Sequence, residues 1–242
     1  MVDLFVDIET VPDFGPEEYL RASERAESGE LTRESDPALF WKLKTGSLTP
    51  FEGRTMLITY QVRGGHLFRL KEWEEGERAI LKKFYDVVMD LQRGKEDKLR
   101  IIGHNVFGFD MMFLYNRILH HKINDPKWVY LWLIRKPLIL DLLQMHIPLN
   151  SCRSKGLKHD ALAMAYGLPT KGTSGGGEAA HYFRGEYDKV LAYSEREFVY
   201  PEMFARIESG GLVGAERLCE CIKKCEEAAA EGSGQGASQG PP

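Results

Sequence analysis

The sequence predicts an α/β domain with a central mixed sheet flanked by helices. The chain opens with a strand-forming run of β-branched and aromatic residues, Val2 to Ile8. Segments with strand and helix periodicity then follow one another to about residue 208, which is the order expected for a sheet covered by helices. With 242 residues and 43% hydrophobic content, the chain can bury the core of such a domain.

The first half of the chain contains a predicted hairpin followed by two helices. Residues 56–62 and 66–71 alternate as strands around the turn Gly64-Gly65. Apolar residues at helical spacing predict helices over 76–93 and 110–120. Between these helices, residues 100–105 predict a short strand that runs into a loop.

The second half is predicted to be mainly helical. Periodicity does not decide between a strand and a buried helix for Val129 to Ile134. Residues 137–143 predict a strand that turns into a helix. The remaining elements, in chain order, are a helix over 155–166 that ends at Gly167, a flexible glycine-rich loop over 171–177, and helices over 186–208 and 213–230.

These elements predict one domain over residues 1–210, followed by a C-terminal helix over 211–230. Residues 231–242 are rich in Gly, Ser, Gln and Pro and predict a disordered tail. Prolines and glycines interrupt residues 13–54, which we expect to be an irregular segment that covers one face of the sheet. Its length indicates a functional or a mobile segment.

Composition excludes several classes of protein. No window reaches the length of a membrane-spanning helix, and the start Met1-Val2-Asp3 does not resemble a signal peptide. We therefore expect a cytoplasmic protein without a membrane partner. Cys219, Cys221 and Cys225 would lie on one helix, where three thiolates cannot easily surround zinc tetrahedrally, so we expect reduced cysteines.

The charge distribution is uneven. The formal net charge of −4 argues against a protein that coats polyanions. Residues 117–160, however, contain eight Lys or Arg and three acidic residues. This stretch is either a face for a phosphate backbone or a solvated basic surface, and the sequence leaves both readings open.

Two carboxylates end the first strand. Asp7 and Glu9 are two residues apart, so their side chains point to the same face. Two anions held this close repel each other unless a cation lies between them, and hard oxygen ligands suit Mg²⁺ or Mn²⁺. The alternative is an edge strand with a hydrated acidic face.

Two later segments carry further polar candidates. Asp110 follows a predicted strand and Asn105, and stands in the first turn of a helix, where it is a metal ligand or an ordinary N-cap. Tyr193 and Glu197 are four residues apart and share a helical face. Taken alone, such a Tyr–Glu pair is structural.

Together, these segments occur in the order of a known family. Asp7-Ile8-Glu9-Thr10, the Asn105-x-x-x-Phe109-Asp110 stretch and the Tyr193-x-x-x-Glu197 helix resemble the 3′–5′ exonucleases of the DEDD superfamily, in their tyrosine subgroup. The resemblance covers roughly residues 1–210 and is nearest to the proofreading domain of family-B DNA polymerases and its stand-alone relatives. It implies a ribonuclease H-like fold and hydrolysis of single-stranded nucleic acid from its 3′ end, with DNA favoured.

The resemblance also implies the roles of individual residues. Two Mg²⁺ or Mn²⁺ ions would be bound, with Asp7 bridging them and Glu9 and Asp110 each adding a ligand. Tyr193 would hydrogen-bond the attacking water. Besides the 3′ end itself, replication or repair proteins are implied as partners, whereas the oligomeric state is not. The candidates for substrate binding are Thr10, Asn105, Phe109, Lys155 and Lys158.

One position departs from the family pattern. Glu197 stands where the family has Asp, and its additional methylene places the carboxylate about an ångström further out. Mg²⁺ tolerates such a change less readily than Mn²⁺ or Ca²⁺. The site is therefore active, selective for Mn²⁺, or degenerate, in which case the protein is a non-catalytic nucleic-acid-binding module.

Other residues have weaker claims. His181 and Glu186 have the spacing of the histidine subgroup and compete with Tyr193 and Glu197 for the fourth position. Asp141 follows an apolar strand and is expected to cap the next helix and support the site. The remaining candidates are aromatic residues for base stacking, for which burial in the core is the alternative, and a further cation for phosphates: Tyr60, Phe107 and Arg153.

Overall fold

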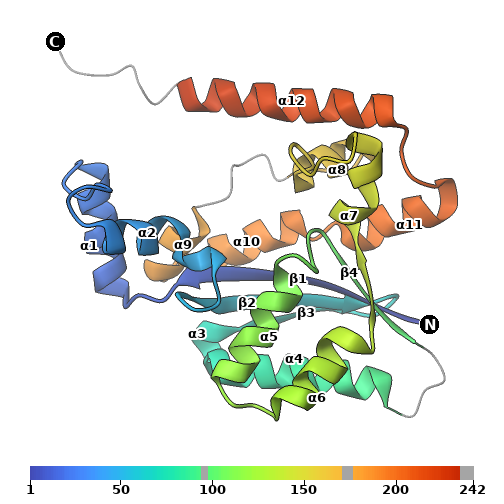
Figure 1. The fold of residues 1–242 in the computed structure, drawn as a ribbon, viewed down its shortest axis with the longest axis horizontal. Coiled ribbons are helices and arrows are strands. Elements are labelled where there is room, and N and C mark those ends of the chain that lie inside the picture. Colours follow the sequence, from blue (N-terminus) through green and yellow to red (C-terminus); the bar gives the residue numbers. More distant parts are fainter. Residues whose placement is uncertain (94–97, 171–176, 235–242) are drawn as a thin grey trace.

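A five-stranded mixed sheet forms the centre of the molecule (Figure 1). The computed structural model describes residues 1–93, 98–170 and 177–234. In spatial order, the strands are β3 (Leu67–Lys71), β2 (Gly53–Val62), β1 (Val2–Pro12), β4 (Leu99–Gly103) and β5 (Leu138–Asp141). β1 pairs antiparallel with β2 and parallel with β4, and β5 continues the parallel side. The predicted α/β class with a mixed sheet is confirmed.

Helices cover both faces of this sheet (Figure 1). One layer contains α4 (Glu77–Gln92), α5 (Asp110–His120), α6 (Pro126–Tyr130) and the π-helical turn η2 (Leu131–Arg135). The opposite layer contains α8 (His159–Ala165), α10 (Tyr187–Glu197), α11 (Tyr200–Gly210) and α12 (Ala215–Gly234). The shorter helices are α3 (Glu72–Glu75), α7 (Leu142–His146), the 3₁₀ turn η3 (Ile147–Asn150) and α9 (Glu178–Phe183).

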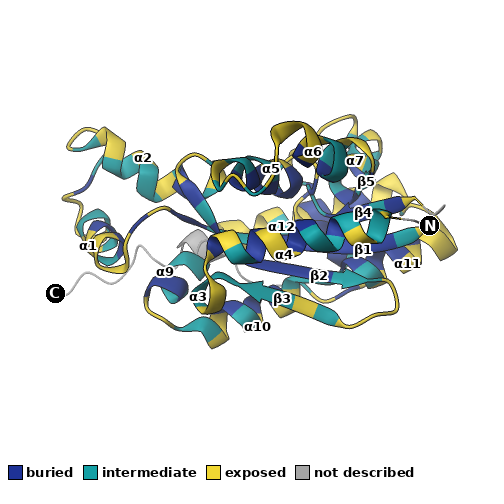
Figure 2. Ribbon diagram, turned by 90° about the horizontal axis from the view of Figure 1, so that it is seen from below, coloured by how far each residue is buried: buried dark blue, intermediate teal, exposed yellow. Residues whose placement is uncertain are grey.

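Successive side chains of β1 point to opposite faces of the sheet and so face the two helical layers in turn. Leu4, Val6 and Ile8 pack into the core formed with α4 and α5. Phe5 packs into a second core with residues of α8 and α11. Because side chains alternate along a strand, Asp7 and Glu9 point to the same side as Phe5. Figure 2 shows β1 largely buried between the layers.

The late helix predicted over 186–208 is wrong as a single element. The chain forms α10 and α11, and the helix is interrupted at Phe198 and Val199. Pro201 explains the break, because a proline inside a helix lacks the amide hydrogen and clashes with the carbonyl four residues earlier. The prediction for 155–166 is also too long: α8 begins at His159, after Gly156 adopts a positive φ of 87°.

The helical alternative is the correct one for Val129 to Ile134, which lie in α6 and η2. The tail predicted from residue 231 begins too early, because α12 continues to Gly234. The rest of that tail, and all but the last residue of the loop predicted over 171–177, lie outside the described residues.

The segment over 13–54 is more regular than expected. It contains α1 (Pro16–Glu27), α2 (Pro37–Thr45) and the 3₁₀ turn η1 (Gly46–Leu48). Its aromatic residues Phe14 and Tyr19 are buried, and the Tyr19 ring stacks on Phe183 of α9 at 4.1 Å between centroids. The segment therefore packs beside α9. In the part of the chain that the structure describes, no helix is both long and apolar enough to span a membrane.

Candidate metal centre

The candidate site lies where β4 ends beside β1. The register pairs Val2 to Phe5 of β1 with Leu99 to Ile102 of β4, and β4 ends one residue later at Gly103. Gly103 lies so close to β1 that a Cβ there would stand 2.6 Å from the Val6 carbonyl oxygen. Beyond this point, no strand in the described part of the chain lies beside β1 on the β4 side to accept its backbone hydrogen bonds. The Ile8 amide donates to Oδ1 of Asp110 at 3.0 Å.

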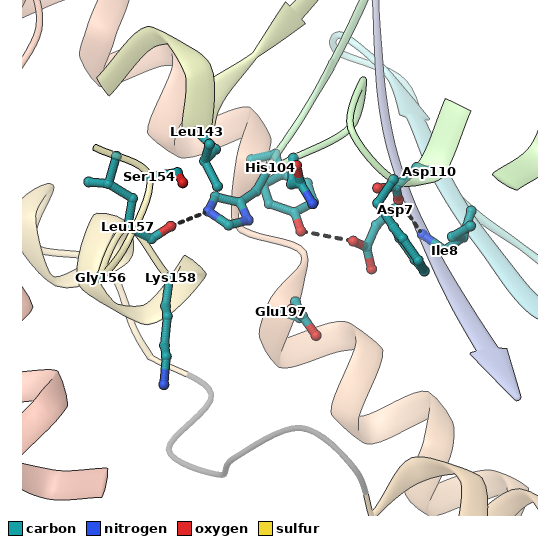
Figure 3. Close-up of a pocket in the computed structure, with 13 residues that line it drawn as sticks. Asp7, Ile8, His104, Asp110, Leu143, Ser154, Gly156, Leu157, Lys158 and Glu197 are labelled. Carbon is teal, nitrogen blue, oxygen red and sulfur yellow. Dashed lines mark hydrogen bonds between the residues drawn. The ribbon is translucent and has the colours of Figure 1, made fainter. Parts of the chain in front are cut away.

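This hydrogen bond brings Asp110 next to the two carboxylates of β1. Asp110 is the first residue of α5 and is buried, with 4% of its surface exposed. Phe109, and not Asp110, occupies the N-cap position of α5. The ordinary N-cap reading of Asp110 is therefore wrong, and its carboxylate spans the junction between α5 and β1 (Figure 3).

Three carboxylates from two distant segments form a cluster. Oxygen atoms of Asp7, Glu9 and Glu197 all lie within 4.8 Å of one another. Asp7 and Glu9 come from β1, and Glu197 is the last residue of α10. The longer side chain of Glu197 thus reaches the β1 carboxylates. A divalent cation could bind this set of oxygen atoms.

The electrostatics fit a cation at this place. Burial raises the pKa of the Asp110 carboxyl well above its usual range, and the negative charge of Asp7 raises it further. Such a shift expresses first the cost of burying a carboxylate and then the cost of placing it beside another one without a positive charge. Hard carboxylate oxygens are the ligands that Mg²⁺ and Mn²⁺ prefer. The residues present therefore fit a divalent metal ion.

The cluster opens into a cavity of about 510 Å³. Asp7, Asp110 and Glu197 line one part of it, and His104, Leu157 and Lys158 line another (Figure 3). His104 is fixed by a 2.9 Å hydrogen bond between its Nε2 atom and the Leu157 carbonyl. An acidic wall thus faces a wall that carries a lysine.

Tyr193 contacts the cluster from the side of a second cavity. Its phenol hydrogen-bonds Glu197, and its ring lines a cavity of about 500 Å³ together with His181 and Lys189. Burial raises the pKa of Tyr193, and the charge of Glu197 raises it further, followed by those of Glu178 and Glu9. The phenol therefore remains protonated at neutral pH and can donate a hydrogen bond.

Tyr200 is a site residue that the sequence analysis missed. It is the first residue of α11, only 1% of its surface is exposed, and its hydroxyl donates to Oδ1 of Asp7 at 2.9 Å (dashed in Figure 3). Burial raises the pKa of Tyr200 well above its usual range, and Asp7 adds to this. No local pattern in the sequence identifies it, because its partner Asp7 is 193 residues away and α10 ends before it.

Asp141 organises the loop between β4 and α5. It caps α7 by accepting from the Leu143 amide at 3.0 Å, as expected. It also accepts from the amides of Asn105 at 2.9 Å and Phe107 at 3.1 Å. Asn105 lines the first cavity with a left-handed backbone, φ 55°. Asp141 therefore supports this wall of the cavity.

The structure separates the residues predicted to bind substrate. Asn105, Phe109 and Lys158 line the first cavity, whereas Thr10 and Lys155 are not among the described residues that line it. The Thr10 hydroxyl donates to the Ser47 carbonyl at 2.7 Å, so it fastens the turn η1 to β1. Lys155 is exposed on the loop before α8.

The other candidates for stacking and phosphate contact also differ in position. The Tyr60 ring is buried and stacks on Phe68 at 5.2 Å, which makes it a core residue. Phe107 is 42% exposed. Arg153 is exposed and is not among the described residues that line either cavity.

His181 and Glu186 do not join the carboxylate cluster. Their side chains hydrogen-bond each other, and Lys189 adds a 3.0 Å contact to Glu186. Among the described residues, the one group of acidic, His or Cys side chains arranged for a metal is Asp7, Glu9 and Glu197. Cys219, Cys221 and Cys225 are free thiols on α12.

Comparison with known proteins does not assign the chain. No protein-family model matches it, and no curated protein matches it. The chemistry of the site therefore has to be inferred from the arrangement of its side chains.

Proposed function

We propose that this protein is a divalent-metal-dependent 3′–5′ exonuclease with a ribonuclease H-like fold. The observation that carries the proposal is the meeting of Asp7 and Glu9 with Glu197, which is 188 residues after Glu9, within 4.8 Å. Asp110 lies against the same strand through the Ile8 amide. Three carboxylates are thus grouped and a fourth lies against the same strand, and this grouping supports the proposal.

The roles of the residues follow from their positions. Asp7, Glu9, Asp110 and Glu197 would hold two Mg²⁺ or Mn²⁺ ions. When bound, such ions lower the pKa of a water molecule and neutralise charge on the attacking and leaving oxygens of a phosphodiester. Tyr193, whose hydroxyl hydrogen-bonds Glu197, would orient the attacking water by accepting a hydrogen bond from it on the phenol oxygen.

The cavity beside the cluster suits a strand end. Its volume of about 510 Å³ falls in the range of sites for small ligands, so it could accept one terminal nucleotide. Lys158, on the wall opposite the carboxylates, would contact a phosphate, and Phe109 offers an aromatic surface to a base. Single-stranded DNA is the substrate we favour, and the product would be a nucleoside monophosphate.

A second candidate function is a non-catalytic nucleic-acid-binding module. One observation favours it: hydrogen bonds from Tyr200 and from the Ile8 amide already engage one oxygen of Asp7 and one of Asp110. Oxygens that keep these partners would offer fewer lone pairs to a metal. In this case the cavity would bind a strand without cleaving it.

The test is degradation of a 5′-labelled single-stranded DNA, and of the matching RNA, with Mg²⁺, Mn²⁺ or EDTA. We expect a ladder that shortens from the 3′ end with either metal and is absent with EDTA and in Asp7→Ala. The control Asp86→Ala removes an exposed carboxylate of α4 that pairs with Lys82, and should retain activity. A circular strand, which has no 3′ end, should remain intact.

The outcomes separate the two functions. A strand that is bound in a mobility-shift assay but not cleaved with any metal would contradict the exonuclease and favour the binding module. Cleavage that persists in Asp7→Ala would mean that the carboxylate cluster is not the active site.

A further inference from the structure

Asp7 accepts a hydrogen bond from α11, a helix that contributes no carboxylate to the cluster. The hydroxyl of Tyr200, at the start of α11, donates to Oδ1 of Asp7 at 2.9 Å. Both residues are buried, with 8% of Asp7 and 1% of Tyr200 exposed. A hydrogen bond to a charged group away from water is stronger than an exposed one, so this contact restrains the Asp7 carboxylate.

The phenol is itself fixed by its surroundings. The His159 ring lies 5.6 Å from the Tyr200 ring between centroids, and the Phe198 ring lies at 5.5 Å. Both contacts are close to the edge-to-face geometry that aromatic rings prefer. Tyr200 therefore has little freedom to turn its hydroxyl away from Asp7.

The break between α10 and α11 makes this arrangement possible. Glu197 ends one helix and Tyr200 begins the next, and both line the first cavity. Pro201 enforces the change of direction. One short connection thus supplies a carboxylate to the cluster and a hydrogen-bond donor to the carboxylate that faces it.

We infer that Tyr200 is a positioning residue that holds Asp7 for metal binding. Its hydroxyl donates to Oδ1 and thereby restrains the plane of the carboxylate. Partners of this kind orient metal ligands, and their removal commonly costs about 10–100-fold in metal affinity. This inference rests on the proposed metal site and adds a residue to it.

The experiment measures Mn²⁺ binding by isothermal titration calorimetry and by the electron paramagnetic resonance signal of free Mn²⁺. Tyr200→Phe removes the hydroxyl and keeps the ring. We expect its dissociation constant for Mn²⁺ to rise by about 10–100-fold. Cleavage at subsaturating Mn²⁺ should fall by a similar factor and recover at high Mn²⁺, which a purely structural defect would not allow.

A matched control separates the loss of Asp7 positioning from the effect of removing any buried tyrosine hydroxyl. Tyr166 lies in the same apolar core as Tyr200, is 6% exposed, and its hydroxyl bonds Nε2 of His146 at 2.6 Å. Tyr166→Phe should lower thermal stability but leave Mn²⁺ affinity unchanged. Should Tyr200→Phe fail to fold, Tyr200→Met also removes the donor while filling the space more adaptably.

The outcomes distinguish this inference from the proposed function. If the unmodified protein binds Mn²⁺ and Tyr200→Phe binds it equally well, Tyr200 does not position Asp7 and the inference is overturned. Tighter binding in Tyr200→Phe would also overturn it, since the hydroxyl would then compete with the metal. If the unmodified protein binds no Mn²⁺, the metal site itself is wrong.

Discussion

Glu197 is the residue at which the sequence departs from the motif of the predicted family. Its carboxylate nevertheless lies within 4.8 Å of Asp7 and Glu9, and Tyr193 hydrogen-bonds it. From the last position of α10, the glutamate side chain is long enough to bring its carboxylate to the cluster. Shortening this side chain would therefore withdraw a ligand.

We predict that Glu197→Asp lowers metal-dependent cleavage with both Mg²⁺ and Mn²⁺. The carboxylate would retreat by about an ångström, and a misplacement of that size can cost on the order of 100-fold in rate. The measurement is the rate of shortening of a 5′-labelled strand at saturating metal. An increase in Mg²⁺-supported activity would show instead that glutamate strains the site.

The control for this prediction lies on the same helix. Glu195 is 71% exposed and contacts Arg69 at 3.5 Å, outside the carboxylate cluster. Glu195→Asp makes the same chemical change two residues away, and its cleavage rate should match that of the unmodified protein.

Single residues differ in how far the sequence can predict them. The spacing of Asp7 and Glu9 on a strand fixes that they share a face, and this is what the structure has. Tyr200 could not be found in the same way, because its partner is 193 residues away and its orientation depends on the break before Pro201. The hydroxyl of Thr10, which the resemblance assigned to substrate, donates to the Ser47 carbonyl, a contact that the motif did not indicate.

At the scale of elements, a buried charge cluster joins α4, α5 and β2. Glu77 accepts from Nε and Nη2 of Arg117 at 2.8 and 2.5 Å, from Nε2 of His121 at 2.7 Å, and from the Thr55 amide at 2.8 Å. Arg117 also donates to the Pro50 carbonyl at 3.1 Å, in the turn before β2. These bonds connect α4 and α5 to the turn before β2. This turn follows η1, whose Ser47 accepts a hydrogen bond from Thr10.

The same cluster predicts how stability depends on pH. Burial acts to raise the pKa of Glu77, but the hydrogen bonds from Arg117, His121 and the Thr55 amide outweigh it and the pKa is lowered. A carboxyl whose pKa is lower in the folded state stabilises the fold above its unfolded pKa, and this stabilisation is lost as pH falls through the folded value. Glu77→Gln should therefore cost about 3–5 kcal/mol at pH 7, because it leaves Arg117 buried without a counter-charge.

The measurement is urea unfolding from pH 7 downward. The difference between the unmodified protein and Glu77→Gln should be full at pH 7 and shrink below about pH 4.5, the ordinary value for this carboxyl. Glu75→Gln removes a partly exposed partner of Lys83 and should change the free energy of unfolding by less than about 1 kcal/mol. A difference for Glu77→Gln that is independent of pH would contradict the assignment.

Elements whose signals are local were predicted most closely. The helix over 110–120 has both bounds that its apolar stripe indicated. The helix over 186–208 was predicted without its break, since its periodicity continues across Pro201 while the backbone does not. For the segment from Val129 to Ile134, the sequence left strand and helix open because both bury an apolar run.

At the scale of the whole molecule, the sequence predicted a mixed sheet but not the order of its strands. The order β3-β2-β1-β4-β5 places β1 in the centre, with the antiparallel strand β2 on one side and the parallel strand β4 on the other. Pairing of this kind joins residues about a hundred positions apart, which local periodicity does not encode. The central position of β1 places it between α5 and α10, which lie on opposite faces of the sheet (Figure 1).

This convergence predicts that metal stabilises the entire fold. The cluster brings together carboxylates from β1 and α10, so a cation bound there would link segments at the two ends of the chain. A ligand at 100 times its dissociation constant adds about 2.7 kcal/mol to the free energy of unfolding. For a protein of this length, that gain corresponds to an increase in Tm of roughly 5–10 °C.

Thermal unfolding with Mn²⁺ and with EDTA measures the effect. The unmodified protein should gain this increase in Tm with Mn²⁺, whereas Asp7→Asn should unfold at the same temperature under both conditions. In EDTA, Asp7→Asn should be at least as stable as the unmodified protein, because it removes a negative charge from a cluster of carboxylates that repel one another. An equal Mn²⁺-dependent shift in both proteins would place the stabilising ion elsewhere, and the absence of any shift in the unmodified protein would count against a metal at Asp7, Glu9 and Glu197.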